Sequence, residues 1–259
     1  MITMITMLSS LISLLATLPS EGGGGRLLLV VIVAILPAVL LGGYLYYIDS
    51  KREPALWLLL GVLLGVLICL PVDYIEEQLS GFLFPPSGKP DNLFESVVNS
   101  LLVVAIPEET LKLLAFLLLV FRNRHFDEHF DGIIYAASVS LGFAAVENVN
   151  YLLDQPGWAV IPVVRSCLLV LGHYACAVLM GYYYSLHRYV NSKCLNLYLV
   201  LLMPIVVHAV FNTLLVPFWG GLSVFLFFLF CYYIHRTCKN KIAFHLANDM
   251  GFMNENYRI

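Results

Sequence analysis

Long apolar stretches separated by short polar segments make up most of this chain. A helix that spans a bilayer needs about 20 mostly apolar residues, and seven stretches reach or approach that length. We expect one transmembrane helix from each of them: residues 27–48, 55–72, 97–120, 132–153, 158–187, 195–216 and 219–235. The pattern therefore predicts an all-α fold, a polytopic membrane helix bundle whose transmembrane domain covers residues 27–235.

The segments outside these stretches differ in character. Residues 1–26 are apolar at first and then rich in glycine, and they lack the basic start of a signal peptide. An interfacial helix, a cleaved leader and an eighth transmembrane helix are all open for them. Residues 73–93 contain many Asp, Glu, Pro and Gly residues and are expected to form the largest outer loop. Residues 236–259 are expected to form a cytoplasmic tail.

Composition agrees with a membrane protein. The chain is 60% hydrophobic and 12% charged, and its mean hydropathy is +0.86, whereas soluble domains carry about 25% charged residues. No soluble domain of useful size fits outside the apolar stretches. No basic patch of the kind that binds nucleic acid is present. The six cysteines form no CxxC pair, which argues against a disulfide framework or a zinc ribbon.

The positions of lysine and arginine predict the orientation in the membrane, because cytoplasmic loops carry more of them. With seven spans, ten of these residues lie on one side: Lys51, Arg52, Arg122, Arg124, Arg188, Lys193, Arg236, Lys239, Lys241 and Arg258. The other side holds only Arg26 and Lys89. The C-terminus is therefore expected in the cytoplasm, and the expected localisation is the plasma (inner) membrane of a prokaryote.

Ionisable and amide side chains interrupt four consecutive apolar stretches, from residues 97–120 to residues 195–216. Charge inside a bilayer is costly, so an ionisable residue there is by default a functional-site hypothesis. The residues concerned are Glu108, Glu109 and Lys112, then Glu147 and Asn148, then His173, and finally His208 and Asn212. We expect the four helices to bring these side chains together around one polar site.

Spacing along each helix indicates which polar side chains share a face. Glu108 and Lys112 are four residues apart, in the favourable order for an ion pair. Phe143, Glu147 and Tyr151 recur every four residues, so they lie along one side of their helix. A purely structural reading is open for each cluster, because polar side chains also join helices inside membranes.

The residue types suit hydrolysis. Glu108 and Glu109 are adjacent carboxylates that cannot easily both ionise in a low dielectric, so one of them can take and return a proton. His208 and Asn212 are four residues apart. Such a pair can polarise a carbonyl group and hold the oxyanion that develops on it.

Four motifs lie in order on the four polar helices. They are Glu108-Glu109-x-x-Lys112, Phe143-x-x-x-Glu147-x-x-x-Tyr151, Gly172-His173 with Gly181-Tyr182, and His208-x-x-x-Asn212. Across residues 97–216 the chain resembles the PrsW family of intramembrane proteases, within the wider group that contains the CAAX prenyl proteases. That group usually carries Arg one position after Lys112 and His at Glu147, which favours PrsW. The resemblance implies a membrane-anchored protein substrate, such as an anti-sigma factor.

The resulting hypothesis is an intramembrane endopeptidase. Glu108 or Glu109 would activate a water molecule, helped by His173. His208 and Asn212 would stabilise the tetrahedral oxyanion. The lipid bilayer and a membrane-anchored protein are the expected partners.

The remaining site residues have supporting roles in this hypothesis. Glu147 would orient a histidine or complete the water site, and Lys112 would tune the glutamate pair. Phe143, Asn148 and Tyr151 would line or support the site.

Other readings stay open. No cofactor is certain, but His173, His208 and a glutamate could hold Zn²⁺ in a catalytic site, although the chain has no HExxH motif. A proton-coupled transporter or channel could use the same Glu and His residues as a relay. A membrane scaffold without catalytic activity is the third reading.

Overall fold

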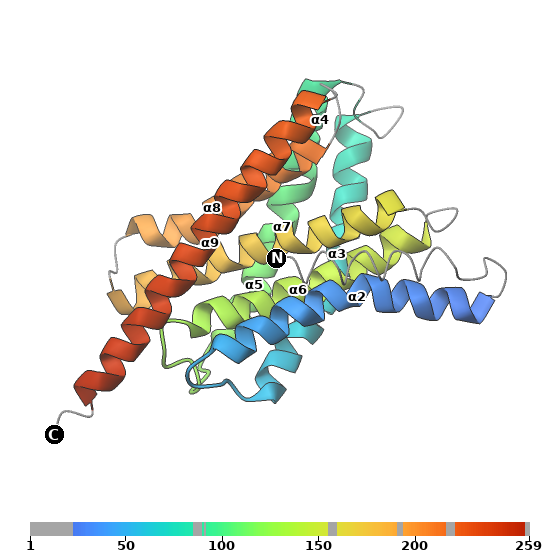
Figure 1. Ribbon diagram of the computed structural model, residues 1–259. Helices are drawn as coiled ribbons and strands as arrows, with labels where there is room; N and C mark the ends of the chain where they lie inside the picture. Colours follow the sequence, from blue (N-terminus) through green and yellow to red (C-terminus); the bar gives the residue numbers. More distant parts are fainter. Residues whose placement is uncertain are drawn as a thin grey trace.

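The computed structural model describes residues 23–84, 90, 92–154, 160–190, 194–215 and 221–256. Every regular element in those residues is helical (Figure 1). Six helices are long and apolar enough to cross a membrane: α2 (Gly23–Ile48), α3 (Ala55–Leu83), α6 (Asp131–Leu153), α7 (Val160–Ser185) with its π-helical extension η2 (Leu186–Val190), α8 (Cys194–Leu215) and α9 (Gly221–Asn256). The predicted all-α membrane bundle is confirmed, whereas the role of residues 1–22 lies outside the described residues.

The remaining expected span, residues 97–120 (the third along the chain), consists of three helical segments in succession. They are α4 (Leu93–Val98), the π-helical segment η1 (Asn99–Ala105) and α5 (Ile106–Val120). The backbone N–H of Ile106 bonds the carbonyl of Leu101, five residues earlier, and Pro107 follows in the first turn of α5. π-helical turns often occur at functional sites. The backbone thus forms a widened turn directly before the glutamate pair, Glu108 and Glu109.

The helix α3 is longer than its apolar pattern indicates. It runs through Leu83 with Pro71 inside it, so the expected outer loop at residues 73–93 is wrong for its first half. Membrane helices tolerate an internal proline when neighbouring groups satisfy the freed carbonyls. The acidic residues Asp73 and Glu76 stay helical because both line polar clefts rather than facing lipid.

The last helix, α9, also exceeds its expected length. It continues past residue 235 to Asn256, so most of the expected tail is helical. Figure 1 shows α9 running obliquely across α8 and α7 toward the C-terminus. Inside this extension Asp249 is buried and bonds the start of α6.

The helix α6 forms the centre of the bundle and packs against α2, α3, α5 and α7 (Figure 1). Its contact with α3 is made by glycines. A Cβ atom on Gly142 would lie 2.3 Å from the carbonyl oxygen of Val62, and one on Gly65 would lie 2.0 Å from that of Val139. Small residues at helix crossings let backbones approach closely in membranes. This tight packing fixes the height of α6 relative to α3.

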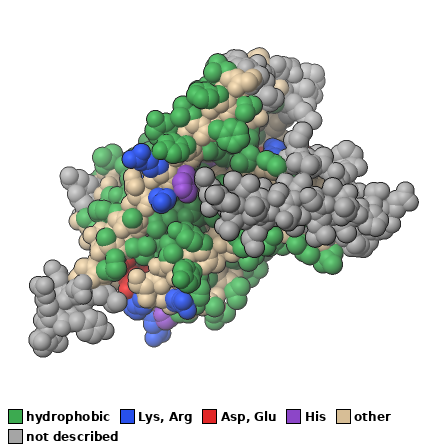
Figure 2. Space-filling model, viewed as in Figure 1, with side chains coloured by type: hydrophobic (Ala, Val, Ile, Leu, Met, Phe, Trp, Pro, Cys, Tyr) green, Lys and Arg blue, Asp and Glu red, His purple; other side chains and the backbone are tan. Residues whose placement is uncertain are grey.

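The outer faces of the bundle are apolar, as a lipid-facing surface requires. Figure 2 shows hydrophobic side chains over most of the described surface in view, with basic groups confined to a few places. On α3 the exposed residues include Leu56, Leu59, Leu63, Leu67 and Leu70. The polar side chains of the four central clusters are instead turned inward.

Candidate active site

The first turns of α5 place three charged groups inside the protein. Glu108, Glu109 and Lys112 are 3%, 0% and 1% exposed. The Nζ atom of Lys112 lies 2.6 Å from Oε2 of Glu108 and 2.9 Å from Oε1 of Glu109. One ammonium group thus binds both carboxylates, and the spacing of three and four residues puts all three on one side of the helix.

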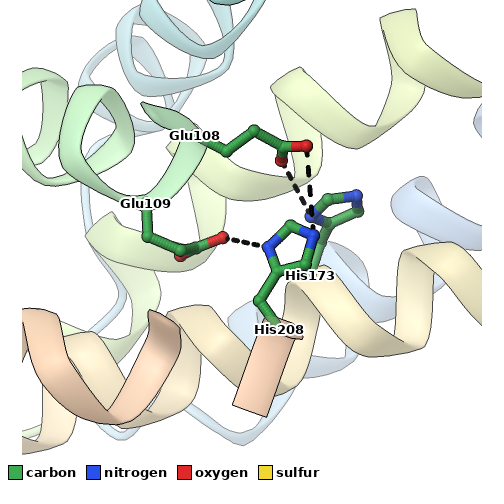
Figure 3. Close-up of side chains that lie close together, drawn as sticks. All are labelled: Glu108, Glu109, His173 and His208. Atoms are coloured by element: carbon green, nitrogen blue, oxygen red, sulfur yellow. Dashed lines mark hydrogen bonds and ion pairs between the residues drawn. The ribbon is translucent and has the colours of Figure 1, made fainter. Parts of the chain in front are cut away.

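Two histidines from other helices complete the cluster (Figure 3). His208 on α8 has Nδ1 2.8 Å from Oε1 of Glu109 and Nε2 3.9 Å from Oε1 of Glu108. His173 on α7 has Nδ1 3.0 Å from the Nζ of Lys112 and 3.9 Å from Oε2 of Glu108. The two imidazole rings lie edge to face, with centroids 5.2 Å apart. Side chains from α5, α7 and α8 therefore meet at one point.

Glu147 on α6 holds His173 from the other side. Its Oε2 atom lies 2.7 Å from Nε2 of His173. The Glu147 side chain is 36% exposed, whereas His173 is 3% exposed, so the carboxylate stands at the mouth of the cluster. A carboxylate behind a histidine fixes the orientation of the ring and raises its basicity.

The hydrogen bonds of His173 also fix its tautomer. An ammonium group only donates hydrogen bonds, so Nδ1 must accept from Lys112. The ring proton then lies on Nε2, where it is donated to Glu147. The lone pair on Nδ1 therefore points toward the glutamate pair.

Phe143 and Tyr151 share the face of α6 that carries Glu147, as their spacing predicts. The Nζ of Lys112 lies 4.1 Å from the centroid of the Phe143 ring, and that ring meets His173 edge to face. Tyr151 has the guanidinium of Arg165 over its ring at 4.2 Å. These aromatic rings form apolar walls and stabilise nearby cations.

The two asparagines expected at the site lie differently. Asn148 is buried, and its Nδ2 donates to the carbonyls of Ala34 and Ser166 at 3.3 and 3.1 Å. It therefore joins α2, α6 and α7 on a side of α6 other than that of Glu147. Asn212 is half-buried one turn after His208. Within the described residues, it makes no hydrogen bond to the acids or imidazoles of the cluster.

A cleft of about 180 Å³ opens onto this cluster. Glu108 and Glu147 line it, together with Cys69, Val72, Asp73, Glu76, Phe143, Asn150 and Tyr151. A neighbouring cavity of about 400 Å³ shares Asp73 and Glu76 and adds Glu77 and Ser80. The two hollows together form a polar, acidic route toward Glu108.

Sequence reasoning missed the acidic residues of this route because it assigned residues 73–93 to a loop. The signal that could have found them is helical spacing. Cys69, Asp73, Glu76 and Ser80 follow one another at three or four residues, which continues one face of α3 beyond Pro71. The acids are therefore part of the helix that borders the active site.

Cavity size alone would point elsewhere. A larger cavity, about 610 Å³, lies between α2, α3 and α6 and is lined almost wholly by apolar side chains. None of the acids or histidines of the cluster lines it. The smaller cleft is the candidate active site because the polar side chains converge there.

The donor atoms of the cluster fit a metal ion. Glu108, Glu109, His173 and His208 each offer one ligand atom, and these atoms lie within 4.8 Å of one another. Two imidazoles and carboxylate oxygens are a donor set that zinc uses in catalytic sites. In addition, Oε2 of Glu109 is buried without a hydrogen-bond partner in the described structure. The ammonium of Lys112 shows that the same donors already attract positive charge.

Comparison with known proteins agrees with this geometry. A family model described as "PrsW family intramembrane metalloprotease" matches residues 53–235. A protein named Protease PrsW from Oceanobacillus iheyensis is 31% identical, over 80% of this chain and 95% of its own length. Proteins of the same name from Geobacillus kaustophilus and Bacillus subtilis are each 33% identical, over 72% and 70% of this chain and 80% of their own lengths. No solved structure matches.

These matches cover the four helices that carry the motifs, and they come from bacteria. With six helices able to cross a membrane, the protein is an integral membrane protein. The matches to a protease family support a peptide-bond hydrolase rather than a transporter or a scaffold. The chain belongs to the PrsW family of intramembrane metalloproteases.

Proposed function

We propose that this protease cuts a membrane-anchored protein at the cleft formed by α3, α5 and α6, with Glu108 as the general base. The observation that carries the proposal is the convergence of Glu108, Glu109, His173 and His208, whose ligand atoms lie within 4.8 Å of one another. Anti-sigma factors are the substrate class that the resemblance of the motifs suggests.

The position of the cleft favours Glu108 over Glu109 as the general base. Glu108 lines the cleft, so its carboxylate can meet a water molecule that enters there. Glu109 is completely buried and is bound by both Lys112 and His208. A general base must reach the proton that it removes. We therefore assign proton removal to Glu108 and a holding role to Glu109.

His173, His208 and Glu109 are the residues that would hold a metal ion. This is a two-histidine, one-glutamate set of the kind found in zinc proteases. A bound zinc ion would polarise the scissile carbonyl as a Lewis acid. Holding it would use the Nδ1 lone pair of His173 and the unpartnered oxygen of Glu109.

Glu147 prepares His173 for this role. Its carboxylate accepts the Nε2 proton of His173 and so directs Nδ1 toward the glutamate pair. Glu147 also lines the cleft, where it can accept a hydrogen bond from the attacking water. We assign it orientation of the histidine and of the water.

When no metal ion is bound, His208 is the group that supports oxyanion stabilisation best. Its Nε2 edge lies near Glu108 at 3.9 Å, where a substrate carbonyl would approach the water. Asn212 lies one turn away on the same helix and has no hydrogen bond to the cluster within the described residues. We therefore assign it no step, and its substitution should change activity less than that of His208.

Water would reach Glu108 through the acidic route along α3. Hydrolysis inside a bilayer needs such a path, because lipid excludes water. Asp73 and Glu76 border both hollows, so they can keep the route hydrated.

The test is cleavage of a membrane-anchored reporter protein by purified full-length enzyme in detergent or liposomes. Glu108→Gln should lower the rate by about 10²- to 10⁴-fold, the usual contribution of a general base. Glu95→Gln is the matched control, because Glu95 lies in the first turn of α4 and is not part of the cluster. Full activity of the Glu108→Gln and Glu109→Gln double variant would refute the proposal.

The role of the metal is tested separately by metal analysis and chelation. Loss of cleavage on chelation and its return with Zn²⁺ would support the assigned ligands. Undiminished cleavage by protein with no measurable metal would refute them and leave the glutamate mechanism in place.

A further inference from the structure

A second cluster of acids lies at the opposite end of α6 from the active site. Glu53 in the α2–α3 loop, Asp127 in the α5–α6 loop and Asp131 at the start of α6 each offer a carboxylate oxygen, and these oxygens lie within 4.8 Å of one another. Asp131 precedes Glu147 by 16 residues, which is about 24 Å along a helix. This cluster is therefore separate from the catalytic groups.

Two of the three acids are deeply buried. Asp131 is 0% and Glu53 is 3% exposed. Oδ2 of Asp131 accepts hydrogen bonds from the backbone N–H groups of Asp127 and Glu128, each at 2.7 Å. The hydroxyl of Tyr135 donates to Glu53. The structure therefore holds the carboxyl groups of Glu53 and Asp131 close together in the interior of the protein.

The two buried acids, Glu53 and Asp131, have no basic partner among the described residues. Lys51 binds Asp127 at 2.5 Å, but no lysine or arginine of the described chain forms an ion pair with Glu53 or Asp131. Oδ1 of Asp131 is buried and has no hydrogen-bond partner among the described residues. Leaving such an atom without a partner is costly in a low-dielectric interior. A cation bound at this point would satisfy it.

We propose that Glu53, Asp127 and Asp131 bind a hard divalent cation, Mg²⁺ or Ca²⁺. The donors are all carboxylate oxygens, which these ions prefer to nitrogen or sulfur. The side chain of Asp127 is 46% exposed, so it provides the open side through which a partly hydrated ion enters. The remaining coordination positions are filled by water, as is usual for Mg²⁺.

The position of this site suggests what the cation does. It joins the loop before α3 to the start of α6, and these two helices border the catalytic cleft. In addition, Asp249 of α9 accepts hydrogen bonds from the backbone N–H groups of His129 and Phe130, on the α5–α6 loop, at 2.7 and 2.9 Å. The cation would thus stabilise the junction of α3, α6 and α9 without touching the substrate.

The test uses Tb³⁺, which binds at oxygen sites of this kind and luminesces when a nearby tyrosine is excited. Tyr135 bonds Glu53 directly and would serve as the sensitiser. The purified full-length protein is first saturated with Zn²⁺, so that the histidine-containing site is filled. Tb³⁺ should then give a saturable signal that Ca²⁺ or Mg²⁺ displaces.

Three variants make the result specific. Asp127→Asn should weaken Tb³⁺ binding about tenfold, since affinity depends on the number of charged ligands, and it should fold because Asp127 is half-exposed. The double variant Glu53→Gln and Asp131→Asn should lose the signal. Asp154→Asn, an exposed acid just after α6, should behave as the unchanged protein does.

Two outcomes would overturn the proposal. One is the absence of any saturable Tb³⁺ signal in the unchanged protein, which would mean that a proton shared by Glu53 and Asp131 balances the charge. The other is an affinity that Asp127→Asn leaves unchanged. Neither outcome bears on reporter cleavage, so this inference can fail while the proposed active site stands.

Discussion

Oε2 of Glu147 and Nε2 of His173 lie 2.7 Å apart and join α6 to α7 at the mouth of the catalytic cluster. This contact fixes the ring so that its other nitrogen faces Lys112 and the glutamates. It is the link between the exposed cleft and the buried charges. Its removal should therefore affect catalysis more than folding.

Glu147→Gln should lower the cleavage rate about 10- to 100-fold, the usual effect of losing a carboxylate behind a functional histidine. The amide can still accept the Nε2 proton, but it carries no charge. The measurement is the rate of reporter cleavage together with the midpoint of thermal unfolding. Asp154→Asn, just after the end of the same helix, is the control. A cleavage rate equal to that of the unchanged enzyme would show that Glu147 does not orient His173 for catalysis.

Lys112→Met should destabilise the protein by about 3 kcal/mol or more, because it leaves two buried carboxylates without their cation. Thermal unfolding in detergent measures the loss. Lys239→Met, at an exposed position of α9, is the control. If the metal ligands are assigned correctly, Zn²⁺ should raise the unfolding midpoint of Lys112→Met more than that of the unchanged protein. An unfolding midpoint that Lys112→Met does not shift would contradict the charge compensation seen in the structure.

Gly142→Ala should destabilise the bundle by about 1–3 kcal/mol, the usual cost of overpacking. The new Cβ would lie 2.3 Å from the Val62 carbonyl oxygen, so α3 and α6 must move apart. Gly43→Ala is the matched control, since nothing lies within 4 Å of a Cβ at that helical position. It should leave stability unchanged or raise it slightly. Equal stability of the two variants would mean that α3 and α6 are not in close contact.

Glu76→Leu should reduce cleavage several-fold by making the route to Glu108 apolar, while Glu76→Gln should reduce it less. Glu76 borders both hollows, and a leucine there would exclude water from the passage. Glu95→Leu serves as the control for a new leucine near the same surface. Reporter cleavage at saturating substrate is the measurement. Equal rates for Glu76→Leu and Glu95→Leu would place the water route elsewhere.

The stability of the junction near α9 should fall as the pH rises. Burial raises the pKa of Asp49 from 3.8 to about 6 and that of Glu128 from 4.5 to about 7. Because both folded-state values exceed the unfolded ones, the folded protein favours the protonated forms. Their stabilising contribution is complete below about pH 4 and is lost as the pH passes through about 6 to 7.

Thermal unfolding across this pH range measures the effect. Glu128→Gln removes one of the two groups and should flatten the dependence. Stability that increases over the same range, or an identical slope in Glu128→Gln, would exclude these acids as the source.

The sequence predicted the bundle and the meeting of acids with imidazoles for a clear physical reason. The length of an apolar stretch identifies a membrane-spanning helix. Charged side chains inside the membrane need polar partners, so Glu108, Glu109, His173 and His208 were expected to contact one another. The sequence did not predict in the same way which neighbours the asparagine side chains would contact. Asn148 bonds backbone carbonyls of α2 and α7 instead, because the rotation of a helix about its axis is set by tertiary packing.

Two features of the backbone also escaped prediction. The extension of α3 through Asp73 and Glu76 depends on the clefts beside it, and the larger of the two exists only after η1 packs against α3. The π-helical turn before Pro107 depends on hydrogen-bond register, which apolar periodicity does not encode.

The placement of Lys112 within one helical turn of both glutamates has a consequence for biogenesis. The neutralising partner is supplied by the same short segment, three and four residues away, rather than by a helix synthesised later. The span that carries the paired anions can thus enter lipid with only one net negative charge, before α7 and α8 have emerged to contribute their imidazoles. Insertion of the nascent chain and assembly of the finished centre are thereby separated in time.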